Sequence, residues 1–437
     1  MKRKIYKFKN GATLLYKRRK LCNATSLVAG FFCGHKYENN GLPHLFEHMM
    51  MKGTTKRTYD QIIEDKTNIS FLNAYTNDNM ICTTIYQSNK KLEEIFEFSS
   101  DILFNSTFDQ ENKDSEVNVI MEEKTRWIDQ CTKNISQQHY CFLRSSEGSI
   151  QQMADRMFGN EDFLKSITKE DFINYKNKHF VPNKFIASVT TSLPFGKIKK
   201  LIKKYYINNL KQPNEESILP PLSYTIDAKQ SINIIKSESQ GLRVIVSIKN
   251  NVEKGCYRFD YNLDCLNERL DHKTNSLKQT TRKNGLTYSC ESAIDYNKLE
   301  DTMWVGASFS TRTLENMEQI LSIFGDSIKQ LKKDGLSEQE IALFKENCKL
   351  VRDKRMPVDY IESSDNFIRH YHKYGDEKPK TNKEIDKLRD KITTQSIKET
   401  INKMYNPEND LHITIMGNID ESKLKTIEEY KKLIFKD

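Results

Sequence analysis

Two histidines four residues apart, His44 and His48, flank Glu47 in the segment His-Leu-Phe-Glu-His. Positions i and i+4 of a helix share one face, so both imidazoles can reach a single metal ion. Glu47 then lies beside whatever else that metal holds. Two ordinary core or surface histidines are the alternative interpretation. The residue types and their spacing predict a metal site with an acidic group next to it.

A third ligand is expected from the acidic stretch 114–123, in which Asp114 can cap a helix. A catalytic zinc ion takes three protein ligands and keeps one position open for water. Glu116 and Glu123 share a helical face, whereas Glu122 points about 100° away. We therefore expect Glu123 to be the third ligand. Without the histidine motif, a solvated acidic face would be the preferred interpretation of Glu116 and Glu123.

Such a site has the chemistry of peptide-bond hydrolysis. Zinc lowers the pKa of a bound water toward neutrality and polarises the scissile carbonyl. Glu47 can take the proton and return it to the leaving amine. A peptide in such a site usually lies as an added strand on a sheet edge, recognised through its backbone and a few side-chain pockets. We expect one Zn²⁺ per chain and peptide substrates.

The histidines need a short, well-anchored helix. Pro43 suits a first helical turn and Gly53 closes the segment, so the sequence predicts a helix over 43–52. Alternating apolar residues from Ile5, followed by Asn10-Gly11, predict a strand that enters a hairpin turn. The side chains expected to pack the metal-bearing helix into a core are Leu45, Phe46, Met49 and Met50.

A repeat with an offset of 225 residues runs through the chain. Its first copy contains Ile167-Thr168, Phe180-Val181-Pro182 and a strand from Phe185 to Val189; its second contains Ile392-Thr393, Tyr405-Asn406-Pro407 and a strand from Leu411 to Met416. In both copies a helical pattern separates the threonine from the aromatic residue. The ordered match indicates a duplicated domain.

Two homologous α+β domains follow, over 1–210 and 226–437, each a mostly antiparallel sheet covered on one face by helices. The prolines of the segment between them predict an extended linker over 211–225. The first domain contains the metal motif, and the second contains no H-x-x-E-H.

Composition favours a soluble folded protein, because 22 Phe and 20 Tyr supply core side chains. The net charge of +9 is spread along the chain, so nucleic-acid binding is not expected. Nine cysteines without a C-x-x-C pair fit a reducing compartment. No early apolar stretch is long enough for a signal peptide or membrane span, and the first strand begins close to Met1. We expect a cytoplasmic location and no membrane partner.

The glutamate at position 123 lies 75 residues after the second histidine (123 − 48). With H-x-x-E-H and the E-x-x-V-I-x-x-E pattern of 116–123, this spacing resembles the pitrilysin/insulinase family of inverted-motif zinc peptidases. The mitochondrial-processing-peptidase-like branch is the most similar. Further segments that resemble family signatures are Gly41-Leu42-Pro43, Lys52-Gly53-Thr54, Leu72-Asn73-Ala74-Tyr75-Thr76 and Gly285-Leu286-Thr287-Tyr288-Ser289.

The resemblance implies roles for matching residues. His44, His48 and Glu123 match the zinc ligands, and Glu47 matches the general base. Glu116 matches a second acidic residue beside the site, which orients a ligand. Asn73 matches a position near the bound peptide, where its amide can hydrogen-bond substrate backbone; a turn-forming Asn at a strand end is the alternative.

For the second domain, the resemblance implies closure of a chamber over the first domain and an Arg and a Tyr that contact substrate. Tyr288 matches the Tyr and could stabilise an oxyanion, with a buried structural Tyr as the alternative. The matching Arg position is Thr281, and Arg282 is displaced by one residue. Relatives carry a glycine-rich turn where 271–275 reads Asp-His-Lys-Thr-Asn.

Three functional hypotheses remain. The chain is an active zinc endopeptidase for unfolded peptides, a non-catalytic core subunit of a larger complex, or a catalytic subunit that needs a divergent partner chain. Homodimers and heterodimers both fit by analogy. The intact ligand set and Glu47 favour the enzyme, because a scaffold has no physical need for them.

Overall fold

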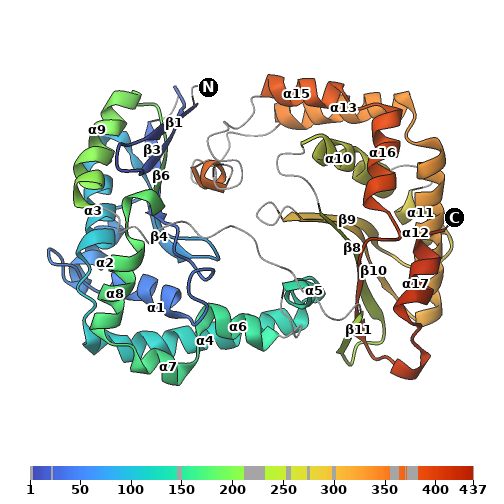
Figure 1. Cartoon of the computed structure of the whole chain (residues 1–437), viewed down its shortest axis with the longest axis horizontal. Coiled ribbons are helices and arrows are strands. Elements are labelled where there is room, and N and C mark those ends of the chain that lie inside the picture. The colour runs from blue at the N-terminus through green and yellow to red at the C-terminus, as the bar shows by residue number, and fades with distance from the viewer. Residues whose placement is uncertain are drawn as a thin grey trace. The chain divides into compact units, whose positions relative to one another are not determined.

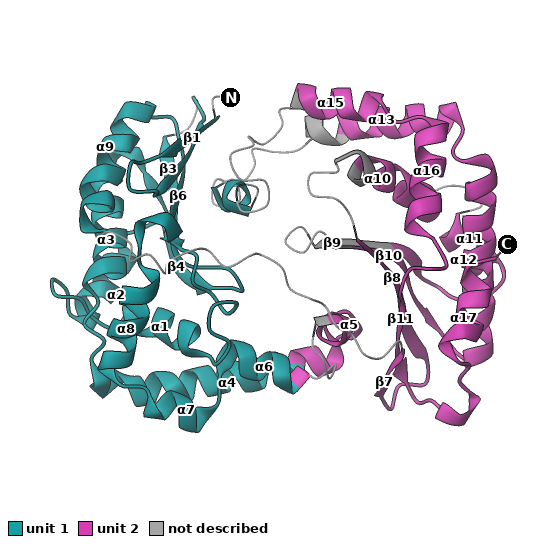
Figure 2. Cartoon of the chain, viewed as in Figure 1, with its two compact units in different colours: residues 1–129, 151–221, 357–379 teal, residues 130–150, 222–356, 380–437 magenta. Residues whose placement is uncertain are grey.

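The computed structural model describes residues 3–20, 23–144, 150–210, 232–251, 257–272, 276–297, 302–354, 364–369, 371 and 382–436. The chain divides into two compact units, coloured separately in Figure 2. Unit 1 contains 1–129, 151–221 and 357–379, and unit 2 contains 130–150, 222–356 and 380–437. Each unit therefore combines segments from both halves of the chain. The linker predicted over 211–225 lies outside the described residues, and the domain limits at 210 and 226 stay predictions.

A six-stranded sheet forms the centre of unit 1. Its strands are β1 (Arg3–Lys7), β2 (Thr13–Arg18), β3 (Ala24–Phe31), β4 (Phe71–Thr76), β5 (Ile81–Ser88) and β6 (Phe185–Thr191). Their order is β1-β2-β6-β3-β5-β4, and all neighbours are antiparallel except β2 and β6. The hairpin predicted at Asn10-Gly11 joins β1 to β2 and pairs Lys7 with Thr13. Strand β4 is at one edge of this sheet.

The helices of unit 1 share one core with this sheet, and most of them lie on one of its faces (Figure 1). They are α1 (Leu42–Met50), α2 (Tyr59–Thr67), α3 (Leu92–Asn105), α4 (Lys113–Lys133), α6 (Ile150–Phe158), α7 (Glu161–Ser166), α8 (Lys169–His179) and α9 (Phe195–Tyr205). Helix α1 is the helix predicted over 43–52, and the four apolar side chains expected to anchor it are fully buried. The expected cap of α4 is wrong: a 3-10 turn over Gln110–Asn112 leads directly into the helix, so Asp114 lies inside its first turn.

Unit 2 repeats this arrangement with a five-stranded sheet. Its strands are β7 (Ile232–Lys236), β8 (Leu242–Asn251), β9 (Cys290–Asn297), β10 (Thr302–Thr311) and β11 (Leu411–Gly417). Their order is β7-β11-β8-β10-β9, with β11 and β7 as the parallel pair. Its helices are α5 (Ile135–Arg144), α10 (Tyr257–His272), α11 (Leu277–Lys283), α12 (Leu314–Asp334), α13 (Glu338–Lys354), α15 (Asn382–Asp390), α16 (Thr394–Met404) and α17 (Ile427–Ile434). The predicted α+β class, with mostly antiparallel sheets, is confirmed.

The 225-residue offset recurs in the backbone. Thr168 and Thr393 are the N-caps of α8 and α16, and each closes a capping box with the third residue of its helix. The two helices lead to β6 and β11, each of which forms a parallel pair within its own sheet. The repeat seen in the sequence therefore corresponds to one helix and one strand in each unit.

The face of each sheet opposite its main helical layer is contacted by a helical segment from the other half of the chain. In unit 2, His139 of α5 is hydrogen-bonded at 2.7 Å to Thr414 on β11 and at 2.7 Å to Ser247 on β8. In unit 1, Phe367 and Ile368 of the helical segment 364–369 are buried against the sheet. Within the described residues, no helix is both long and apolar enough to span a membrane.

Candidate metal centre

The structure brings His44, His48 and Glu123 together. One ligand atom from each lies within 4.8 Å of the others, and the two Nε2 atoms are 3.2 Å apart. The nearer Glu123 oxygen, Oε2, is 3.6 Å from His44 Nε2 and 3.9 Å from His48 Nε2. Glu122, the weaker candidate on the same helix, is exposed. Two imidazoles and one carboxylate are the donor set of a catalytic zinc site, so these residues fit that ion.

The position of helix α1, and with it that of both histidines, is fixed at the helix N-terminus. Gly41 is the N-cap with φ of 82°, a conformation that favours glycine, and Pro43 occupies the first turn. A Cβ at position 41 would lie 2.4 Å from the backbone nitrogen of Gly159, at the end of α6. The close approach of two backbones therefore fixes where α1 begins.

Glu116 holds His48 in one orientation. Its Oε2 lies 2.9 Å from His48 Nδ1 and its Oε1 lies 2.5 Å from Lys52 Nζ. Burial alone would raise the pKa of Glu116, but the hydrogen bonds from His48 and Lys52 outweigh burial and lower it. The carboxylate is thus ionised and can only accept, so Nδ1 donates, and in the neutral ring Nε2 keeps its lone pair on the side of His44.

The two imidazoles have opposite pKa shifts. Burial, with the nearby His48 and His35 acting in the same direction, lowers the pKa of His44 to about 3, so this ring is neutral near pH 7. Burial would also lower the pKa of His48, but the hydrogen bond with Glu116 and the neighbouring carboxylates raise it. A neutral imidazole is the form that binds a metal.

Glu47 is buried, with 9% of its surface exposed, and its Oε2 lies 4.0 Å from His44 Nε2. Burial, opposed by His48 and supported by the charges of Glu123 and Glu116, raises the pKa of Glu47 to about 7. A carboxylate with this affinity for protons can accept one near neutral pH and release it again.

Three neighbours of the site were not assigned roles from the sequence. Lys52 lies four residues after His48, a helical spacing that indicates the same face as that ligand. The hydroxyl of Thr76 on β4 donates to the carbonyl of Pro43 at 3.4 Å, and it also lowers the pKa of Glu47. His35 is buried with its ring centroid 6.3 Å from that of His44, and no spacing signal announced it.

The other residues predicted for the site come from segments of the sequence outside 44–48 and 116–123. Asn73 is exposed on β4, opposite Thr84 of β5. Tyr288 in unit 2 is 80% exposed, so the alternative of a buried structural Tyr is wrong, because the loop after α11 leaves the ring in solvent. The guanidinium of Arg282 lies 5.0 Å from the centre of that ring. Thr281 is buried and donates to the backbone of Leu277 at 2.8 Å.

Contacts of Tyr288 and Arg282 with a substrate stay predictions. The place of the expected glycine-rich turn, 271–275, is only partly covered, since 273–275 lie outside the described residues.

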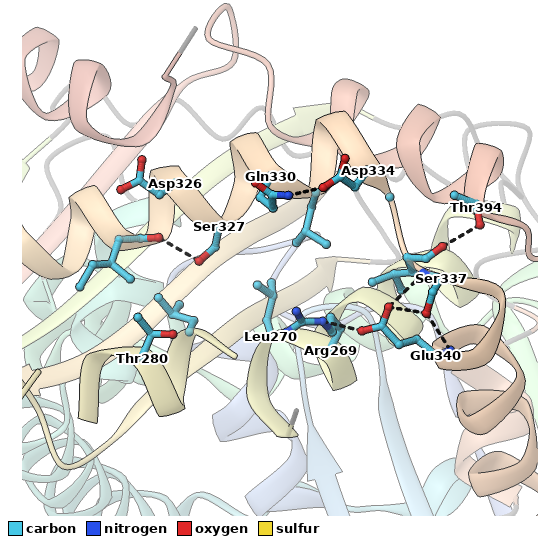
Figure 3. A pocket seen from close by; sticks show the side chains of 15 residues that line it. Arg269, Leu270, Thr280, Asp326, Ser327, Gln330, Asp334, Ser337, Glu340 and Thr394 are labelled. Carbon is cyan, nitrogen blue, oxygen red and sulfur yellow. Dashed lines mark hydrogen bonds and ion pairs between the residues drawn. The ribbon is translucent and has the colours of Figure 1, made fainter. Parts of the chain in front are cut away.

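A separate cavity of about 730 Å³ lies within unit 2, between α10, α11, α12 and the start of α13 (Figure 3). Its polar side chains bond within the fold: Arg269 Nε is 2.7 Å from Glu340 Oε1, and Glu340 also accepts from Ser337. Asp326 is paired with Lys436 at 2.6 Å. In the described part of the chain, the histidine and glutamate cluster of unit 1 is the one set of at least three converging metal-binding groups.

Comparison with known protein families separates the two halves of the chain. A family model described as "Insulinase (Peptidase family M16)" matches residues 30–145, which include the three candidate ligands and Glu47. A model described as "Peptidase M16 inactive domain" matches residues 166–348. The second match begins within the first predicted domain, ends at residue 348 and contains no H-x-x-E-H.

Individual relatives agree with these matches. The chain is 30% identical over 223 residues to an "Uncharacterized zinc protease" of Rickettsia felis, covering 49% of this chain and 52% of that protein. It is 27% identical over 209 residues to the "Mitochondrial-processing peptidase subunit beta" of Caenorhabditis elegans, covering 46% and 44%. The matched region thus spans about half the length of these curated relatives.

A solved structure shows the same fold. The first half of the periplasmic protease PqqL from Escherichia coli superposes with a TM-score of 0.78 at 15% identity, covering 100% of this chain and 97% of that one. At this identity the likeness concerns the fold alone. The two family models and the named relatives place this chain in the pitrilysin/insulinase family of peptidases, in the branch that resembles mitochondrial processing peptidase.

Proposed function

We propose that this chain is a zinc-dependent endopeptidase that hydrolyses unfolded peptides or short polypeptides. The observation that carries the proposal is the convergence of His44, His48 and Glu123 within 4.8 Å, with the buried Glu47 beside them. When bound there, zinc would supply a Lewis acid that polarises a carbonyl and acidifies water. Relatives named zinc proteases support the same chemistry.

The chain's own residues divide the remaining work. Glu47 takes the proton of the attacking water and returns it to the leaving amine, for which a carboxyl with a pKa near neutrality is suited. Glu116 keeps His48 in the tautomer that presents Nε2. Asn73 lies on β4, the edge strand to which an extended peptide would add, and its exposed amide can bond the peptide backbone.

A catalytic subunit that depends on a second, divergent chain is the alternative that a specific observation favours. Thr281 is buried in its helix where a substrate-binding Arg is expected, so its side chain cannot substitute for a guanidinium. Peptidase activity of the purified chain, measured alone and after mixing with candidate related chains, separates the two versions. Full turnover without a second chain eliminates the partner-dependent version.

The decisive variant is Glu47→Gln. It removes the base and leaves the three ligands in place, so we expect zinc content to stay at one ion per chain while hydrolysis of a mixed peptide pool falls at least about 100-fold. Metal analysis and a chelator-sensitive peptide assay measure both quantities.

Glu122→Gln is the matched control, because Glu122 is exposed on α4 next to the ligand Glu123. It should hydrolyse peptides at the wild-type rate. Undiminished hydrolysis by Glu47→Gln would contradict the assigned role, and a wild-type chain that binds no zinc would remove the basis of the proposal.

A further inference from the structure

The helical segment 364–369 reaches the sheet of the metal-bearing unit although it comes from the other half of the sequence. Both belong to unit 1, whose three stretches share one colour in Figure 2. Phe367 and Ile368 are 3% and 2% exposed. They belong to an apolar cluster on the sheet face opposite the main helical layer, together with Leu15, Val28, Phe32, Met80, Cys82 and Ile186.

One polar contact joins this segment to β4. The hydroxyl of Tyr75 donates to Oδ1 of Asp365 at 2.6 Å, and Nε of Arg369 donates to Oδ2 of the same carboxylate at 2.7 Å. Asp365 is 21% exposed, and Tyr75 pairs across the sheet with the fully buried Cys82. A hydrogen bond to a carboxylate in such surroundings is stronger than one between neutral groups.

Tyr75 lies on β4 close to residues that contact α1 or would face a bound peptide. The next residue, Thr76, bonds the carbonyl of Pro43 on α1, and Asn73 lies two residues before Tyr75 on the same face of β4. In the described part of the sheet, β5 pairs with one edge of β4 and no strand pairs with the other. An edge strand has half the ladder bonds of a central one, so its position depends more strongly on side-chain contacts.

We propose that Asp365 is a positioning residue for the catalytic unit. Through its hydrogen bond with Tyr75, Asp365 fixes the position of β4. In that position the free edge of the strand can pair with a peptide, and Thr76 contacts α1. The proposal rests on the proposed peptidase function. Because Asp365 touches neither the ligands nor Glu47, its loss acts on the binding of the peptide more than on the chemical step.

The variants Tyr75→Phe and Asp365→Ala remove the same bond from its two sides. Each should raise KM for a peptide about tenfold and change kcat less than about twofold, with zinc content unchanged. The double variant should be no worse than the more affected single variant, since both lose one shared bond. Amide hydrogen exchange over residues 71–76 should become faster in all three.

Tyr371→Phe is the matched control. Its hydroxyl lies 3.3 Å from Thr13 on β2, so it removes a comparable contact of the same region from a different strand. It should leave KM and the exchange of 71–76 at wild-type values. Unchanged exchange in Tyr75→Phe and Asp365→Ala, or an equal change in Tyr371→Phe, overturns the proposal. Hydrogen exchange needs no turnover, so an inactive wild type would refute the peptidase function and leave this test intact.

Discussion

At the level of single residues, the metal centre depends on the contacts of the His48 nitrogen that faces away from the ion site. Lys52 Nζ lies 2.5 Å from Glu116 Oε1, and Glu116 Oε2 lies 2.9 Å from His48 Nδ1. Lys52 stabilises the ionised form of Glu116, and Glu116 in turn fixes the tautomer of the ligand. Lys52 therefore influences the basicity of His48 Nε2 through Glu116.

Glu116→Gln tests this chain of contacts. The amide keeps the size of the side chain but loses its charge, so we expect the affinity for zinc to fall about tenfold or more. Competition with a chelating dye measures the zinc dissociation constant. Glu122→Gln, which changes an exposed charge on the same helix, should bind zinc as the wild type does. An equal zinc affinity in Glu116→Gln and wild type would show that the contact is only structural.

At the level of secondary-structure elements, the site depends on where α1 starts. The N-cap Gly41 combines a φ of 82° with a backbone neighbour that a Cβ would meet at 2.4 Å. These are two separate reasons for glycine, one conformational and one steric. A shift of the helix start would move both histidines together.

Gly41→Ala should destabilise the protein by about 2 kcal/mol and lower its zinc content, because α1 must move to relieve the contact with Gly159. Thermal unfolding and metal analysis measure the two effects. Gly196→Ala in α9 is the matched control: nothing lies within 4 Å of its Cβ position, so it should stabilise by up to about 1 kcal/mol. Similar behaviour of both variants would contradict the steric argument.

The sequence predicted the elements whose signals are local. The spacing of His44 and His48, the proline at 43 and the Ile-Thr pairs repeated at an offset of 225 residues were sufficient to place the metal-bearing helix and the repeated helix and strand. The hairpin at Asn10-Gly11 followed from turn chemistry in the same way. Local patterns also gave the wrong cap at Asp114, because a preceding 3-10 turn has no comparable signature.

Contacts between distant segments were beyond such patterns. Nothing in the periodicity of 135–144 or 364–369 indicates which sheet each helix contacts, since an amphipathic stripe specifies a buried face and not its partner. Sequence patterns likewise did not indicate the hydrogen bond between Tyr75 and Asp365 or the approach of His35 to His44. They depend on tertiary packing, which a single sequence does not reveal.

At the level of the whole molecule, each unit contains a helical segment that comes from the half of the chain that does not supply its sheet. Helix α5 docks on unit 2 through His139, whose two ring nitrogens are both bonded, and through Phe142 and Leu143, which pack with Trp304. Burial, together with the nearby His412, lowers the pKa of His139 to about 3. The docked helix therefore requires a neutral imidazole.

The sign of the resulting pH dependence follows from proton binding. An unfolded His139 takes up a proton near its ordinary pKa of about 6.5, while the folded ring stays neutral down to about pH 3. Below pH 6.5 the unfolded state binds more protons, so docking of α5 loses about 1.4 kcal/mol per pH unit as the pH falls. At neutral pH and above, this contribution is complete.

Trp304 provides a local probe of this docking. The chain has two tryptophans, so Trp127→Phe leaves Trp304 fluorescence as a report on α5. In that background, urea unfolding between pH 7.5 and 5 should give a falling midpoint. With His139→Leu added, the midpoint should be lower at pH 7.5, because Ser247 and Thr414 lose their partner, and less dependent on pH. A constant difference between the two proteins at every pH would show that His139 does not couple docking to protonation. A difference that shrinks on acidification is the expected result, since the variant has already lost the group that protons remove from the wild type.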